Sequence, residues 1–476
     1  MSYANLKRFE FWILLICGLA WLDAGAGEGL LALLLAAIPG GAMLSAAVGF
    51  LFYPGDHGIA RTGALGALLG AVFSVPVLLA DPATALGLAV ASVAGFAACG
   101  LIGREVVPVP EDLDAPAATP RLGAEVAADE AVLGLASITM GVFSDGGQTA
   151  VAREIHEALD WYEENGWAKK PADFHEAPPP LEDSDMDFEY RDVSGLPMEI
   201  MSFDSGFTAR PEAPGGRRYM GYGPCRRAYA WVLRGDEDAP WLVNVHGLTM
   251  GQPRLDLKLL QAELLHRSLG LNLVFPVLPL HGPRALSKLS GRGYLSGNAM
   301  DTVHAQSQAL WDIRRIIGWL WSRGSDRIGL HGVSLGGFTI ALVAGLEPGL
   351  RCAIAGIPAS DAAWLIWWHS SQAVRRECLS AGIDRDLLGK AFQVIAPLAV
   401  DPQVPGSRRY IYAGLADRFV PPVLVDRLWR HWGQPSIHWY PGAHLSVLVH
   451  DGPRDYLRRA VEATLLDTAV SPSASD

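Results

Sequence analysis

Three long apolar runs near the start of the chain limit what it can fold into. They cover Leu30–Tyr53, Thr62–Ala80 and Thr84–Ile102. Each approaches or exceeds the roughly 18 residues with which a helix crosses the hydrocarbon core of a membrane. A shorter run, Phe11–Leu22, precedes them, and its length alone suits an interfacial or signal-peptide-like stretch. We therefore expect residues 1–104 to form a transmembrane helical segment of three to four spans.

The charges that flank these runs favour four spans with both ends in the cytoplasm. If Phe11–Leu22 also crosses, basic residues lie on one side and acidic residues on the other: Lys7, Arg8, Arg61 and Arg104 against Asp23, Glu28 and Asp81. Basic residues mark the cytoplasmic side, so we predict a multi-pass protein of a bacterial inner membrane. The middle of each predicted span lacks an ionisable residue, which favours anchoring in membrane lipids over transport.

Net charge divides the chain into three segments. Residues 1–104 carry −1, residues 105–190 carry −16 and residues 191–476 carry +5. The total of −12 gives no general attraction to phosphate backbones, which argues against a nucleic-acid partner. The five cysteines form no C-x-x-C pair and no H-E-x-x-H occurs, so we expect no disulfide framework, no metal and no cofactor.

The middle segment, residues 105–190, is predicted to be an acidic connector with two amphipathic helices. Their patterns lie near Leu122–Met140 and Gln148–Trp167. In the second, Ile155, Leu159 and Tyr162 share one face, as in a helix that packs on a neighbouring domain.

Residues 191–467 are expected to form a catalytic domain of the α/β class, followed by a disordered tail at 468–476. From about Cys225, short apolar runs alternate with helical segments. The predicted strands are Ala228–Leu233, Trp241–Val245, Leu271–Leu278, Arg327–Leu330, Cys352–Ile357, Tyr410–Ala413 and Ile437–Tyr440. The helical candidates are Leu255–Ser268, Thr302–Trp321, Phe338–Leu346, Pro422–Trp432 and Pro453–Leu465. This alternation predicts a mostly parallel sheet with helices on both faces, which binds ligands at the carboxyl ends of its strands.

The motif G-x-S-x-G follows one of these strands. It places Ser334 between Gly332 and Gly336, and an apolar helical stretch comes directly after it. The glycines remove side chains that would collide in a sharp strand–turn–helix, which leaves the serine hydroxyl exposed above the sheet. Ser334 is therefore the predicted nucleophile.

A serine nucleophile needs a base that a third group orients. Asp417 follows the strand Tyr410–Ala413, and His444 follows the strand Ile437–Tyr440. The chain order Ser334, Asp417, His444 is the order expected of this architecture. Asp361, just past an earlier strand, is the alternative acid.

These motifs resemble the α/β-hydrolase superfamily over roughly residues 190–465, as a membrane-anchored, bacterial-type member. The resemblance implies that Asp417 holds His444 and that His444 takes the proton of Ser334. It also places an oxyanion hole at the loop His246-Gly247-Leu248-Thr249. By position we assign its backbone donors to Leu248 and Leu335.

Other residues have open roles. His246 is either a base or, in better agreement with chain order, part of the loop under the oxyanion site. His281 either lines the pocket mouth or holds a loop, and His304 is expected to be only a helix residue. Trp364 lies where the family inserts a lid, predicted here as a cap at residues 358–400. It is either core packing or a surface that binds an apolar substrate.

The sequence thus predicts a serine hydrolase of carboxylic esters, similar to esterases and lipases, with a small-molecule or lipid ester as substrate and the catalytic domain in the cytoplasm. A peptidase or an acyltransferase can use the same three residues, since a fold does not determine the substrate. A scaffold with a hydrolase-like binding domain is the remaining alternative, and it would be expected to lack one of them.

Reporter fusions test the predicted topology. A reporter placed directly after Arg104 should give a cytoplasmic signal, because four spans return the chain to the side of Lys7 and Arg8. A fusion in the predicted external loop around Asp81 is the control and should report the opposite side. An external signal after Arg104 would mean that Phe11–Leu22 does not span or that the orientation is reversed.

Overall fold

The computed structural model describes the chain outside residues 1–4, 54, 140–146, 296–297 and 468–476. The predicted disordered tail, 468–476, lies outside the described residues. Two compact units make up the chain. The first unit comprises Met1–Met140, Gly414–Val423 and Trp439–His450, and the second unit comprises Gly141–Ala413, Leu424–His438 and Asp451–Asp476.

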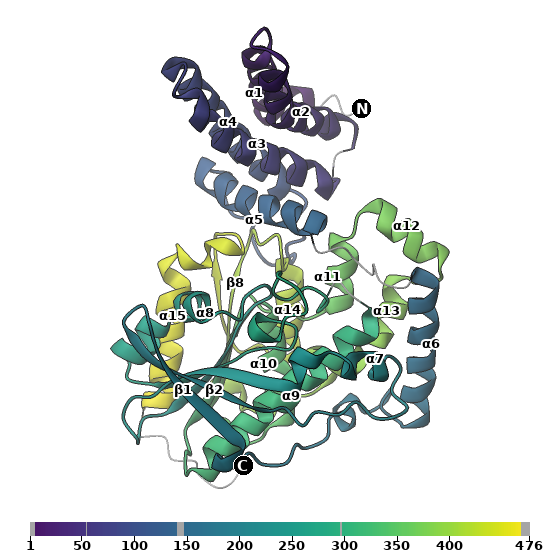
Figure 1. The fold of residues 1–476 in the computed structure, drawn as a ribbon, viewed down its shortest axis with the longest axis vertical. Coiled ribbons are helices and arrows are strands. Elements are labelled where there is room, and N and C mark those ends of the chain that lie inside the picture. Colours follow the sequence, from purple (N-terminus) through teal and green to yellow (C-terminus); the bar gives the residue numbers. More distant parts are fainter. Residues whose placement is uncertain (1–4, 54, 140–146, 296–297, 468–476) are drawn as a thin grey trace. The chain divides into compact units, whose positions relative to one another are not determined.

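Helices form most of the first unit (Figure 1). They are α1 (Phe9–Gly25), α2 (Leu30–Phe52), α3 (His57–Val77), α4 (Pro82–Arg104) and α5 (Pro120–Thr139). Helices α1 to α4 pack against one another as a bundle. Among the described residues, α2, α3 and α4 are long and apolar enough to cross a membrane. Asp56 and Asp81 start α3 and α4, because each carboxylate accepts an N–H of the first turn.

Helix α5 packs on α3 and α4 through a glycine-lined crossing. A Cβ added to Gly100 of α4 would lie 2.8 Å from the backbone nitrogen of Ala127. A Cβ added to Gly123 of α5 would lie 2.6 Å from the carbonyl oxygen of Ala97. Neither position has room for a side chain, so the two helix backbones approach closely.

A mixed nine-stranded sheet is the framework of the α/β part of the chain, in the order β1-β2-β3-β5-β4-β6-β7-β8-β9. The strands are β1 (Met186–Val193), β2 (Leu196–Asp204), β3 (Arg227–Leu233), β4 (Trp241–Val245), β5 (Asn272–Pro276), β6 (Ile328–Val333), β7 (Cys352–Gly356), β8 (Arg409–Gly414) and β9 (Ser436–Tyr440). The pairs β1–β2, β2–β3 and β3–β5 are antiparallel. The pairs β5–β4, β4–β6, β6–β7 and β7–β8 are parallel. The predicted α/β class and mostly parallel core are confirmed.

The sequence pattern does not predict the hairpin of β1 and β2, because the apolar strand-like runs begin only after Cys225. Strand β1 is almost wholly exposed, so its side chains carry little of the apolar signal that marks a buried strand. Val193 pairs with Leu196 across a two-residue turn, and Ser194 and Gly195 both have positive φ, 58° and 78°. Such turns favour a glycine, so Ser194-Gly195 was the available signal.

Ten helices of 5 to 24 residues accompany the sheet in the described part of the chain. They are α6 (Gln148–Glu164), α7 (Gly216–Met220), α8 (Pro253–Leu259), α9 (Ala299–Ser322), α10 (Leu335–Leu346), α11 (Ala362–His369), α12 (Gln372–Ser380), α13 (Arg385–Ala391), α14 (Pro422–His431) and α15 (Asp451–Val461). Helix α6 packs on α9 and α13, and the Tyr162 hydroxyl donates to the carbonyl of Ala391 at 3.3 Å. The prediction that this helix packs is therefore confirmed.

The predicted single helix Leu255–Ser268 is wrong. Helix α8 ends at Leu259, and a separate π-helical turn covers Glu263–Ser268. Between them Gln261 has a φ of 60°, which no α-helix can accommodate. The apolar periodicity continues through this break, and this is why the pattern indicated one helix.

The glycine crossing of α4 and α5 gives a stability test. Gly100→Ala should lower the free energy of unfolding of the detergent-solubilised chain by about 1 to 3 kcal/mol, and with it the melting midpoint, because the added methyl group overpacks the contact. Gly87 lies on the same helix with nothing within 4 Å of an added Cβ, so Gly87→Ala is the matched control and should be neutral or slightly stabilising. Circular dichroism melts compare the two, and equal midpoints would contradict the close crossing.

Candidate active site

Ser334 occupies a strained position between β6 and α10. Its φ is 60° and its ψ is −115°, a backbone conformation that costs a non-glycine residue about 1 to 3 kcal/mol. The surrounding hydrogen bonds hold it there. Its N–H donates to the carbonyl of Gly356 at 2.9 Å, and its own carbonyl accepts from Phe338 at 3.0 Å. The side chain is half-buried, as the sharp turn predicted from the sequence requires.

The two glycines of the motif have no room for a side chain. A Cβ on Gly332 would lie 2.5 Å from the carbonyl carbon of Gly336, and a Cβ on Gly336 would lie 2.8 Å from the carbonyl oxygen of His246. The close approach of strand, turn and helix is therefore the physical reason for the G-x-S-x-G spacing.

Asp417 and His444 form a hydrogen-bonded pair within the first unit. Their Oδ2 and Nδ1 atoms are 2.7 Å apart. The other carboxylate oxygen of Asp417 accepts the backbone N–H groups of Phe419 and Val420, at 2.8 and 2.7 Å. The ring of Phe419 stacks on the imidazole with 4.7 Å between centroids. Both partners of the pair are therefore fixed in orientation.

This environment sets the protonation of His444. Burial lowers the pKa of the imidazole, but the charge and the hydrogen bond of Asp417, together with the charge of Asp129, raise it above its ordinary value. With Nδ1–H donated to Asp417, Nε2 is the nitrogen that can accept a proton. The pair has the chemistry of a general base.

Ser334 lies in the second unit, whereas Asp417 and His444 lie in the first. The structure thus brings the predicted acid and the predicted histidine together. The contact between Ser334 and His444 stays a prediction.

The loop assigned to the oxyanion hole follows β4 and reaches Ser334. A Cβ on Gly247 would lie 3.6 Å from the Cβ of Ser334, and Thr249 has a φ of 68°, so the chain turns sharply here. Leu335 is the first residue of α10, where the helix's own N–H groups have no intrahelical acceptor. The roles of Leu248 and Leu335 as donors remain predictions.

His246 and His281 make contacts typical of loop-holding histidines. His246 is fully buried. Its Nε2 accepts the N–H of Leu278 at 3.1 Å, and its Nδ1 lies 2.8 Å from the carbonyl of Gly247. Burial lowers the pKa of His246 and His281. These contacts favour the loop interpretation of His246 over a base, and of His281, equally buried and 2.9 Å from the carbonyl of Pro279, over the pocket mouth.

Three other candidates have defined surroundings. Asp361, the alternative acid, caps α11 by accepting the N–H of Trp364 at 2.8 Å and pairs with Arg427 at 3.3 Å. His304 lies on α9 as expected, with Nε2 2.8 Å from the carbonyl of Pro214. Trp364 is half-buried, and its ring stacks on Trp368 with centroids 4.8 Å apart. Its role in lining a pocket stays a prediction.

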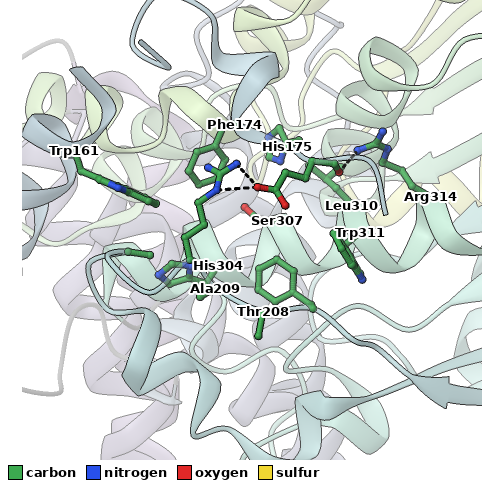
Figure 2. Close-up of a pocket in the computed structure, with 14 residues that line it drawn as sticks. Trp161, Phe174, His175, Thr208, Ala209, His304, Ser307, Leu310, Trp311 and Arg314 are labelled. Carbon is green, nitrogen blue, oxygen red and sulfur yellow. Dashed lines mark hydrogen bonds and ion pairs between the residues drawn. The ribbon is translucent and has the colours of Figure 1, made fainter. Parts of the chain in front are cut away.

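A pocket beside α9 has His304 among its lining residues (Figure 2). Aromatic side chains that include Trp161, Phe174 and Trp311 line it, and none of the three predicted catalytic residues does. Its charged groups are engaged with each other, since Glu176 accepts from Arg210 at 2.8 Å and its carbonyl accepts from Arg314 at 2.7 Å. We therefore interpret the charged groups of this pocket as holding neighbouring parts of the chain together.

Sequence reasoning missed one residue of the site, Asp129 on α5. Its Oδ2 accepts the backbone N–H of His444 at 2.8 Å, and its Oδ1 accepts that of Leu445 at 3.0 Å. Asp129 and Glu130 are fully buried within the run Ala127-Ala128-Asp129-Glu130-Ala131. Adjacent carboxylates flanked by alanines were the available signal, because buried charges are almost always paired.

In the part of the chain that the structure describes, no group of three or more His, Cys, Asp or Glu side chains is arranged to hold a metal ion.

Three turns follow strands of the sheet: the serine elbow (residues 332–336) after β6, the acid turn (415–418) after β8 and the histidine turn (442–446) after β9. Together with the strand order, they define a chain with the α/β-hydrolase fold. No family model matches the sequence. The chain belongs to the family of two Mycobacterium tuberculosis proteins, Uncharacterized protein MT2702 (strain CDC 1551 / Oshkosh) and Uncharacterized protein Rv2627c (strain ATCC 25618 / H37Rv). Each is 41% identical over 325 residues, which are 67% of this chain and 76% of the relative.

Solved structures show a weaker likeness. An acetyl xylan esterase from Paenibacillus sp. R4 has a TM-score of 0.45 and 17% identity, over 64% of this chain and 94% of its own. Acetyl xylan esterase 1 from Thermoanaerobacterium sp. JW/SL YS485 has a TM-score of 0.43 and 16% identity, over 68% and 95%. Likeness at this level carries no argument about activity.

Proposed function

We propose that this chain is a membrane-anchored serine hydrolase that cleaves an ester, a thioester or a lipid acyl bond. The observation that carries the proposal is the 2.7 Å hydrogen bond between Asp417 and His444. It holds the imidazole in the tautomer that leaves Nε2 ready to take a proton. Ser334, on its strained turn, is the hydroxyl that the proposal assigns to this base.

In the proposed reaction, Ser334 Oγ attacks the carbonyl carbon of the substrate while His444 Nε2 takes the hydroxyl proton. The N–H groups of Leu335 and Leu248 donate to the oxyanion that forms, and each such donor is typically worth about 3 to 4 kcal/mol of barrier. His444 then protonates the departing alcohol or thiol. Water, activated by the same imidazole, releases the acid from the acyl-serine.

The location that we propose is a membrane with the site on its cytoplasmic side. Arg8 before α1 pairs with Glu105 after α4 at 2.5 Å, so these two helix ends lie together. Arg61 near the start of α3 pairs with Glu130 of α5 at 3.4 Å. Helix α5 in turn bonds the histidine turn. The Asp417–His444 pair therefore lies at the basic end of the bundle, which the positive-inside rule assigns to the cytoplasm.

The substrate that we propose is a small-molecule or lipid ester. Attachment to a membrane gives access to amphiphilic esters. The half-buried, stacked rings of Trp364 and Trp368 offer an apolar surface for an acyl chain. Parallel assays with p-nitrophenyl esters, peptides and acyl acceptors distinguish hydrolysis of esters from peptidase and acyltransferase activity.

Labelling with a fluorophosphonate tests the nucleophile. The wild-type chain should be labelled at one serine, and Ser334→Ala should lose the label and at least about 1,000-fold of its esterase rate, because the attacking oxygen is gone. Ser371 caps α12, and Ser371→Ala is the control that should label as the wild type does. Equal labelling of wild type and Ser334→Ala would remove the assignment.

A further inference from the structure

We propose that Asp129 is a positioning residue of this active site, which fixes the acid and histidine turns. The inference rests on the proposed function and adds a residue from helix α5 to it. Helix α5 precedes the α/β part of the chain, so the site would depend on the segment that follows the membrane bundle.

Asp129 contacts both turns, at His444 itself and at the residue directly after Asp417. Its Oδ2 accepts the N–H of His444 at 2.8 Å and that of Arg418, directly after Asp417, at 3.1 Å. Its Oδ1 accepts the N–H of Leu445 at 3.0 Å. One carboxylate thereby links the backbone next to Asp417 with the backbone of His444. A shift of Asp129 would move both partners of the 2.7 Å hydrogen bond between them.

The helix that carries Asp129 is itself held in place. The guanidinium of Arg418 donates to Glu130, and both side chains are fully buried. Glu130 also pairs with Arg61 of α3 at 3.4 Å. The apolar residues Leu122 and Val126 of α5 pack with one alanine from each turn, Ala416 and Ala443. Because burial makes these charges costly to leave unpaired, the arrangement resists displacement.

In addition to its hydrogen bonds, the charge of Asp129 affects the pKa of His444. Burial and the neighbouring charge of Asp417 raise the pKa of Asp129 above its ordinary value, against the opposing effect of His444. In return, the charge of Asp129 is one of the causes that raise the pKa of His444. When His444 takes a proton during the reaction, an ionised Asp129 therefore stabilises the imidazolium.

The titratable groups that face Asp129 are Asp417 on the acid turn and His444 on the histidine turn. Its neighbours on α5, Glu125 and Glu130, face His450, Arg418, Arg61 of α3 and Cys99 of α4, and Arg418 also contacts His57 of α3. Glu130 is paired with Arg418 and Arg61, and Glu125 with His450 at 3.0 Å. Of these three carboxylates, Asp129 is the one that accepts backbone N–H groups from both the acid turn and the histidine turn.

The test compares two neutralised carboxylates of the same helix in the full detergent-solubilised chain. Asp129→Asn keeps the size of the side chain but loses its charge and one acceptor atom. Glu125→Gln makes the same change one turn earlier. The measurements are the rate of fluorophosphonate labelling and the esterase kcat and KM across pH.

Asp129→Asn should lower kcat about tenfold, as expected for the loss of one buried hydrogen bond, with KM changed less than about twofold. Removing a negative charge lowers the pKa of His444, and the reaction needs its neutral form. The acid limb of the pH profile should therefore move to lower pH. Glu125→Gln should leave the limb in place.

A purely structural role would lower the amount of active protein and the melting temperature without moving the limb, and this result would overturn the inference. An unchanged rate and limb in Asp129→Asn would overturn it too. If that variant does not fold, Asp129→Ser, which leaves space for a water molecule to accept the same N–H groups, takes its place with the same criteria. Absence of label in the wild type would instead contradict the proposed function itself.

Discussion

A buried carboxylate must be met by hydrogen-bond donors, and two such carboxylates determine the arrangement of the candidate site. Asp417 uses one oxygen for two backbone N–H groups and the other for His444. Asp129 uses both of its oxygens for backbone N–H groups of the same two turns. Neither side chain can leave without exposing unpaired donors in a buried place, which is costly. The orientation of the imidazole follows from this requirement.

The same requirement connects the Asp417–His444 pair to the N-terminal helices. Arg418 follows Asp417 in the sequence and is fully buried against Glu130 of α5, which also meets Arg61 at the start of α3. The glycines at Gly100 and Gly123 let α5 approach α4 closely enough for this network to form. The N-terminal helices therefore supply groups that hold the acid and histidine turns. This arrangement gives them a part in the candidate site, whatever else they do.

The sequence predicts most of the fold because its signals are local. The spacing of Gly332, Ser334 and Gly336 reports a turn too tight for side chains, and buried strands such as β4 and β7 are short apolar runs. The exposed strand β1 has no such run, and the break at Gln261 depends on one backbone angle that periodicity does not reveal. The role of Asp129 depends on contacts with residues about 290 to 315 positions later in the chain, which no local pattern specifies. The role of His246 likewise depends on a distant contact, because its backbone partner Leu278 lies on another loop.

The most direct measurement is the distance between Ser334 Oγ and His444 Nε2 in an experimental structure of the full chain in detergent or a lipid nanodisc. A separation within hydrogen-bond reach, about 2.6 to 3.2 Å or slightly longer without substrate, is the expected result. An imidazole turned away from the hydroxyl by many ångströms, with Asp417 still bound to it, would contradict the proposed relay.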